Sequence, residues 1–153
     1  MLGTLVSDAI ADFLSVAAMA GAPILASQIH VDILAKPHRP KSLPMGKMAV
    51  YSFFLDGQAL KVGKVGPNSG PRFTHQHYAG SAMSTLAETI FFNHHRVGAA
   101  SFTHAKFVGD WIKANTDRVD ILVPATVGLP TLSLLEAFLH VRWNPMFEGR
   151  AEN

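Results

Sequence analysis

Cysteine is missing from all 153 residues of the chain. Its absence excludes disulfide bonds, thiolate metal sites and cysteine nucleophiles. It also fits a reducing compartment, so we expect a cytoplasmic protein. Charged residues are scarce at 16%, whereas hydrophobic residues make up 48%. That balance excludes an intrinsically disordered chain and predicts a globular fold with a sizeable core.

No Asp, Glu, Lys or Arg occurs between Phe13 and Val31, a run long enough to raise the question of a membrane span. Gly21-Ala22-Pro23 interrupts the run. The residues before it include Asp8 and Asp12 but no Lys or Arg, which is the wrong charge for a signal peptide. We therefore expect no membrane partner. The apolar segment is interpreted as buried in the fold or in a homodimer formed through the N-terminal helix.

Acidic residues are nearly missing from the middle of the chain. Between Ile33 and Ala87, Asp56 is the only acid against seven basic residues, which gives a net +6 in a chain whose total is +2. The basic residues are Lys36, Arg39, Lys41, Lys47, Lys61, Lys64 and Arg72. Such a segment indicates either a face that binds a polyanion or a solubilising surface, and charge alone does not choose between them.

Two regions of different character follow from the pattern of apolar residues. Ser7 predicts the start of a helix that runs to Ala20, and Gly21 ends it. Residues 23–35 suit either a helix or a strand. Three prolines between Pro37 and Pro44 then disfavour a helix and indicate an extended basic linker. We therefore predict an N-terminal helical extension with its linker over residues 1–46, and a second domain over residues 47–153.

The second domain is predicted to be α+β, with a small three-stranded antiparallel sheet flanked by helices. Asp56-Gly57 separates two runs rich in β-branched and aromatic residues, which is a strong signal for a tight hairpin. Thr85 and Glu88 form a capping box at the start of a helix. The expected elements are strands over 48–55, 58–65 and 118–124, and helices over 85–95, 104–115 and 128–142.

Three groups of residues carry candidate chemistry. The first is on the hairpin, where Tyr51 on one strand and Lys61 and Lys64 on the other could meet a single phosphate. The alternative is a surface hairpin with solvated lysines and a core tyrosine. The second is Arg72, whose guanidinium offers a fixed fork of donors for phosphate oxygens. His75, His77 and Tyr78 follow it closely. The alternative is a surface arginine beside ordinary histidines.

The third group centres on Glu136, whose helical neighbours are Leu132, Leu135, Leu139 and His140. A carboxylate on an apolar helix face is costly to bury without a partner. A magnesium-type cation would offset that cost. A structural salt bridge to Arg142 or Arg72 would do so equally well, and the sequence leaves both open.

Together these residues resemble the GIY-YIG endonuclease superfamily. Ala49-Val50-Tyr51, nine residues, and then Lys61-Val62-Gly63-Lys64 are similar to the paired GIY and YIG elements. Arg72 matches the catalytic arginine and Glu136 the metal-binding glutamate, over residues 48–147. Lys61 replaces the usual second tyrosine, as in a restriction-enzyme branch where that lysine is implicated as general base. The family's C-terminal asparagine has no counterpart after Pro145-Met146-Phe147.

The resemblance implies an endonuclease that hydrolyses phosphodiester bonds in DNA with Mg²⁺, or Mn²⁺, bound at Glu136. Tyr51, Lys61, Arg72 and Glu136 would be catalytic. The expected nucleic-acid contacts are Lys64, His75, His77 and Tyr78, with Lys36, Arg39, Lys41 and Lys47 of the linker region. Two alternatives remain: a catalytically degenerate nucleic-acid-binding protein of the same fold, and a structural or interaction protein. No His-x-x-x-His pair occurs, so we do not expect a zinc site.

Overall fold

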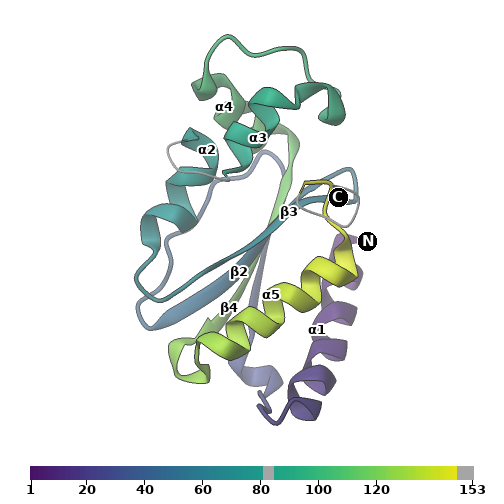
Figure 1. Cartoon of the computed structure of the whole chain (residues 1–153), viewed down its shortest axis with the longest axis vertical. Coiled ribbons are helices and arrows are strands. Elements are labelled where there is room, and N and C mark those ends of the chain that lie inside the picture. The colour runs from purple at the N-terminus through teal and green to yellow at the C-terminus, as the bar shows by residue number, and fades with distance from the viewer. Residues whose placement is uncertain (81–84, 148–153) are drawn as a thin grey trace.

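A four-stranded antiparallel sheet in the order β1-β4-β2-β3 organises the molecule (Figure 1). The computed structural model describes residues 1–80 and 85–147. The strands are β1 (His30–Leu34), β2 (Lys47–Leu55), β3 (Gln58–Val65) and β4 (Asp117–Pro124). The predicted α+β class is confirmed.

The predicted three-stranded sheet is wrong by one strand. All three expected strands are present, but β1 adds a fourth, which pairs with β4 so that Val31 lies opposite Ile121. Residues 23–35 suited a helix or a strand equally well, and long-range pairing selected the strand. Because β1 belongs to the same sheet as β2 and β3, the N-terminal segment and the rest of the chain share one structural unit.

The Asp56-Gly57 hairpin is confirmed. Both turn residues have positive φ, 47° for Asp56 and 87° for Gly57, which is the geometry of the tight turns that match the twist of paired strands. This short turn sets the register, so Tyr51 lies opposite Gly63 and Phe53 opposite Lys61. A one-residue shift in register after Phe53 then bends the hairpin near its tip.

Helices cover both faces of the sheet. The longer ones are α1 (Leu2–Met19), α4 (Ala105–Asn115) and α5 (Leu129–Trp143). The shorter ones are α2 (His77–Ala79) and α3 (Leu86–Phe92). Single turns fill the connections at η1 (Ala26–Gln28), η2 (Arg72–Gln76), η3 (His94–Val97) and η4 (Ala125–Val127).

Two helix boundaries differ from expectation by more than one residue. Helix α1 begins at Leu2 and not at Ser7, whose hydroxyl donates to the Thr4 carbonyl inside the helix. Helix α3 ends at Phe92, three residues early. Its predicted start is confirmed, because the Thr85 side chain accepts a hydrogen bond from the Glu88 amide at 3.4 Å.

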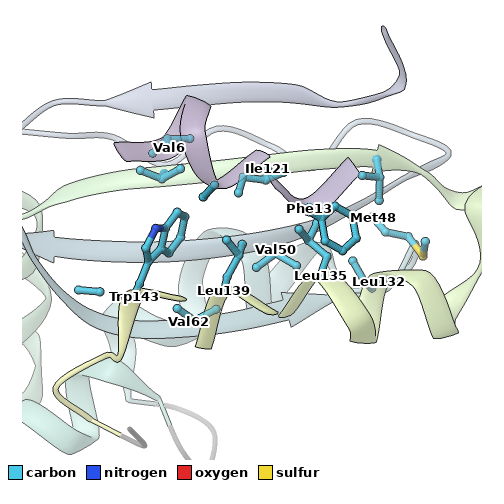
Figure 2. Close-up of a cluster of buried hydrophobic side chains, with 14 of the residues drawn as sticks. Val6, Phe13, Met48, Val50, Val62, Ile121, Leu132, Leu135, Leu139 and Trp143 are labelled. Atoms are coloured by element: carbon cyan, nitrogen blue, oxygen red, sulfur yellow. The ribbon is translucent and has the colours of Figure 1, made fainter. Parts of the chain in front are cut away.

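Helices α1 and α5 lie side by side on one face of the sheet, and the main hydrophobic core lies between them and the strands (Figure 1). Figure 2 shows Leu135 and Leu139 of α5 directed at Val50 of the central strand, with Phe13 of α1 beside them. The second core, on the opposite face, is formed with α2, α3 and α4.

By length and composition, α1 is apolar enough to cross a membrane, with a mean hydropathy of 1.5. Core helices and signal sequences meet the same criterion. Four residues of α1, Val6, Ala9, Phe13 and Ala17, are buried in the main core. The helix therefore has one face that packs against the sheet and α5.

Candidate active site

The candidate site lies along β3, one of the two outer strands of the sheet. Successive side chains of a strand point to opposite faces. Lys61 and Gly63 lie opposite Phe53 and Tyr51 on the face covered by α2 and α3, whereas Lys64 lies opposite Val50 on the face covered by α5. Lys61 and Lys64 therefore belong to different faces. Because β3 is an outer strand, side chains from both faces can approach one group bound along it.

Tyr51 is buried, with 1% of its surface exposed, and its ring lies over Gly63. A Cβ atom placed on Gly63 would come within 2.6 Å of Cζ, the ring carbon that bears the hydroxyl. Only glycine leaves the phenol this space. The pairing of β2 with β3 thus fixes the position of the Tyr51 hydroxyl through a direct steric relationship.

His77, also buried, forms a hydrogen bond through Nε2 with the Tyr51 hydroxyl. Its other ring nitrogen, Nδ1, accepts a hydrogen bond from the Leu86 amide at 3.2 Å. Burial, reinforced by the positive charges of Lys61 and Arg72, lowers the pKa of His77 to about 2. The ring is therefore neutral, and since Nδ1 is an acceptor, the single proton lies on Nε2. His77 donates and the Tyr51 oxygen accepts.

Arg72 lies in η2, a single π-helical turn, where its side chain is half-buried and its positive charge acts on Tyr51. Burial raises the pKa of Tyr51 to about 12, and the positive charge of Arg72 opposes that rise. Tyr51 therefore keeps its proton at neutral pH. Because His77 donates to its oxygen, the Tyr51 hydroxyl keeps a proton that it can donate to a third group.

Lys61 is 3% exposed, and its charge acts on His77. Together with Arg72 and the buried Arg118, it surrounds the Tyr51–His77 pair with positive charge. A concentration of cations at the rim of a sheet favours an anionic ligand such as a phosphate.

Glu136 of α5 faces this group from the other side of β3. Its carboxylate forms an ion pair with Lys64, and the two side chains are 21% and 39% exposed. Its negative charge also contributes to the raised pKa of Tyr51. Neither salt bridge that the sequence left open, to Arg142 or to Arg72, is found among the described residues, and Arg142 instead pairs with Asp12 at 2.8 Å. Glu136 therefore has a salt bridge, but with a partner that the sequence did not indicate.

The side chains available as metal ligands can be compared with those that the expected Mg²⁺ or Mn²⁺ needs. Within residues 1–80 and 85–147, no group of three His, Asp or Glu side chains is placed to hold a metal ion. Glu136 would be the main protein ligand. Mg²⁺ retains several waters and commonly binds one or two carboxylates together with substrate phosphates, so a single carboxylate beside a phosphate-binding group fits it.

Of the expected nucleic-acid contacts after Arg72, only His75 is exposed. It borders an open groove of about 350 Å³ between α2 and α4, which Lys106 and Lys113 also line. His77 and Tyr78 are buried. Tyr78 donates to Nε2 of His38 at 2.8 Å, so its hydroxyl is engaged inside the protein.

The basic linker follows the surface. Lys36 forms an ion pair with Asp56 at 2.9 Å, and Lys41 pairs with Asp32 at 2.8 Å. Arg39 is exposed, and Lys47 is half-buried at the start of β2. Exposed ion pairs of this kind are weak, so both lysines can exchange their partners for phosphates at small cost.

Arg118, which the sequence did not single out, connects strand β4 with the residues of η2 and α2 beside the site. It is fully buried and donates to the Asp120 carboxylate at 2.7 Å, the Tyr78 hydroxyl at 3.0 Å and the Phe73 carbonyl at 2.7 Å. Its guanidinium also lies 5.6 Å from the centre of the Tyr51 ring. On the sequence, Arg118 and Asp120 alternate with apolar residues, which predicts a solvated strand face. Only the helices packed on that face reveal a buried ion pair.

No family model, no curated protein and no solved structure matches the chain.

Proposed function

We propose that the chain is a metal-dependent endonuclease that hydrolyses phosphodiester bonds in DNA. The observation that carries the proposal is the Tyr51 phenol: it receives a hydrogen bond from His77 and experiences the charges of Arg72 and of Glu136 from a distant helix. The similarity of these residues and their order to the GIY-YIG endonucleases supports the choice of reaction and of DNA.

In the proposed reaction, Arg72 stabilises the negative charge that builds on the phosphate in the transition state. Tyr51 retains its proton, since its pKa is about 12, and acts as a hydrogen-bond donor that orients the attacking water or a phosphate oxygen. His77 has both ring nitrogens engaged. Lys61 would therefore orient the attacking water, and only its neutral amine form could accept the proton of that water.

Glu136 would hold Mg²⁺ or Mn²⁺, which when bound supplies Lewis-acid polarisation of the scissile phosphate. The acid approaches from α5, while Arg72 and Tyr51 approach from the opposite face of the sheet. A phosphate lying along β3 would thus meet cationic and donor groups on one side and the carboxylate on the other.

DNA binding would use the exposed basic residues around this edge. We propose His75 and Lys64 as phosphate contacts near the reacting group, with Arg39, Lys41 and Lys36 of the linker following the backbone further away. Such contacts release counterions, so affinity should fall steeply as salt rises.

The direct test is incubation of supercoiled plasmid with the protein and Mg²⁺. The wild type is expected to nick the plasmid, whereas Glu136→Ala and Arg72→Ala should not. Glu88→Ala and Arg142→Ala are matched controls, because Glu88 is an exposed acid on α3 and Arg142 a surface arginine paired with Asp12. Both controls should cut as the wild type does.

The other possible outcomes would contradict the proposed nuclease, and each leads to a different conclusion. Binding without nicking in Mg²⁺ or Mn²⁺ would indicate a degenerate nucleic-acid-binding member of the same fold. Absence of both binding and nicking would favour a structural or interaction protein. Equal nicking by wild type and Glu136→Ala would exclude the site, and would point to a contaminating nuclease.

A further inference from the structure

Glu136 and Lys64 form an ion pair across two elements that are far apart in sequence. Lys64 lies on the outer strand β3, on the same face of the sheet as α5, which carries Glu136. The ammonium group contacts Oε2 of the carboxylate directly. In this arrangement Lys64, which is expected to contact phosphate, is bound to the carboxylate of Glu136, which is expected to bind a metal ion.

These two roles compete. An ammonium group and a divalent cation bound to the same carboxylate would repel each other strongly at contact distance. A metal ion that binds Glu136 therefore has to displace Lys64. The displacement is feasible, because both side chains are partly exposed, at 39% for Lys64 and 21% for Glu136, and exposed ion pairs are weak.

A phosphate of bound DNA offers Lys64 another partner. Lysine carries a compact charge on a flexible stem, so its ammonium group can leave Glu136 by rotation of the side chain alone. Once it contacts a phosphate, the carboxylate is free for a cation, and that cation further neutralises the same phosphate.

We propose that Lys64 is a displaceable counter-ion of Glu136, which makes metal binding and DNA binding depend on each other. The proposal deepens the proposed function, since it takes Glu136 as the metal ligand and DNA as the polyanion. It implies that the free protein binds divalent cations weakly and that bound DNA strengthens this binding. By linkage, the metal must strengthen DNA binding by the same factor.

Titration of the free protein with Mn²⁺, followed by calorimetry or by the electron paramagnetic resonance of the ion, tests the central step without any measurement of activity. Lys64→Gln is expected to bind Mn²⁺ about fivefold more tightly than the wild type, the size of effect at the lower end for coupled sites. Lys64→Arg keeps the positive charge and should bind as weakly as the wild type. Glu136→Gln should lose the binding in either background.

Lys106→Gln is the matched control, because Lys106 is an exposed lysine on α4, in the groove that His75 also borders. It should not change Mn²⁺ affinity. A second titration adds a short DNA duplex and uses the Arg72→Ala protein, so that the duplex stays intact. The duplex should tighten Mn²⁺ binding by Arg72→Ala, and should change it little when Lys64→Gln is combined with Arg72→Ala.

Equal or weaker Mn²⁺ binding by Lys64→Gln would overturn the proposal, as would the absence of Mn²⁺ binding in every variant. Its failure is separable from failure of the nuclease proposal. A protein that nicks plasmid but binds Mn²⁺ independently of Lys64 loses only the counter-ion role. If the protein shows the expected Mn²⁺ affinities but never nicks DNA, only the nuclease proposal fails.

Discussion

The ring of Tyr51 occupies the space that a side chain on Gly63 would fill, on the neighbouring strand. A Cβ on Gly63 would lie 2.6 Å from Cζ of the phenol, so Gly63→Ala must push the ring away from His77 and Arg72. We expect a loss of stability of about 1–3 kcal/mol, typical of overpacked cores, and a large loss of plasmid nicking. Urea unfolding and the nicking assay measure the two effects.

Gly66→Ala is the control for that substitution. Its nearest neighbour would be a methyl group of Leu129 at 3.8 Å, an ordinary contact. It should leave nicking unchanged. If Gly63→Ala is as active as Gly66→Ala, the position of the phenol is not important for the reaction.

The second prediction concerns the proton of His77. Because the Leu86 amide donates to Nδ1, the neutral ring should carry its proton on Nε2, in the wild type and in Tyr51→Phe alike. Long-range ¹H–¹⁵N spectra distinguish the two tautomers. A proton found on Nδ1 would mean that Tyr51 is the donor to His77, which would reverse the role proposed for the phenol.

Tyr51→Phe itself should lower the nicking rate about 100-fold or more, the usual effect of removing one donor to a transition state. Its stability should change little, because the ring that packs over Gly63 remains. Mn²⁺ affinity should also be unchanged, since Glu136 and Lys64 are untouched. A Tyr51→Phe protein with wild-type nicking would remove the tyrosine from the mechanism.

The fourth prediction concerns the buried Arg118. Arg118→Met would leave the Asp120 carboxylate buried without its partner, and we expect a loss of about 3–5 kcal/mol. Asp120→Asn should cost less, because an amide oxygen can still accept from Arg118 and because Oδ2 of Asp120 has no hydrogen-bond partner within the described structure. Arg142→Met, which removes an exposed pair, should cost at most about 1 kcal/mol. Urea unfolding of the three variants measures these losses of stability and ranks them.

The fifth prediction concerns stability in acid. Burial lowers the pKa of His77 from 6.5 to about 2, so below pH 6.5 the unfolded chain binds a proton at this residue that the folded chain does not. Stability from this residue is therefore complete above pH 6.5 and is lost as the pH falls towards 2. The slope approaches about 1.4 kcal/mol per pH unit. The pKa of His38 is also lowered, chiefly by burial, and adds a contribution of the same sign.

Unfolding free energies at about pH 7, 6 and 5 measure that slope. His77→Gln should flatten it, since glutamine does not titrate. An unchanged slope in His77→Gln would show that the residue takes up a proton in the folded protein.

Local interactions made much of the fold predictable. The Asp56-Gly57 turn, the Thr85 cap of α3 and the alternating strand at 117–124 each depend on residues close together in sequence. The same holds for the motif residues Tyr51, Lys61 and Arg72, whose order along the chain suggested a common site. Residues 23–35 were ambiguous because their strand exists only through pairing with β4, more than eighty residues away.

The sequence alone thus specified the hairpin, most helix positions and a short set of polar residues worth testing, because neighbouring residues control those features. Only the packed structure showed that Lys64 is the partner of Glu136, that His77 and Tyr78 are buried, and that Arg118 lies inside a ring of aromatic side chains. Each of these depends on which faces of distant elements meet. The packing of these faces is determined by the burial of apolar surface over the whole chain, and a local sequence pattern does not specify it.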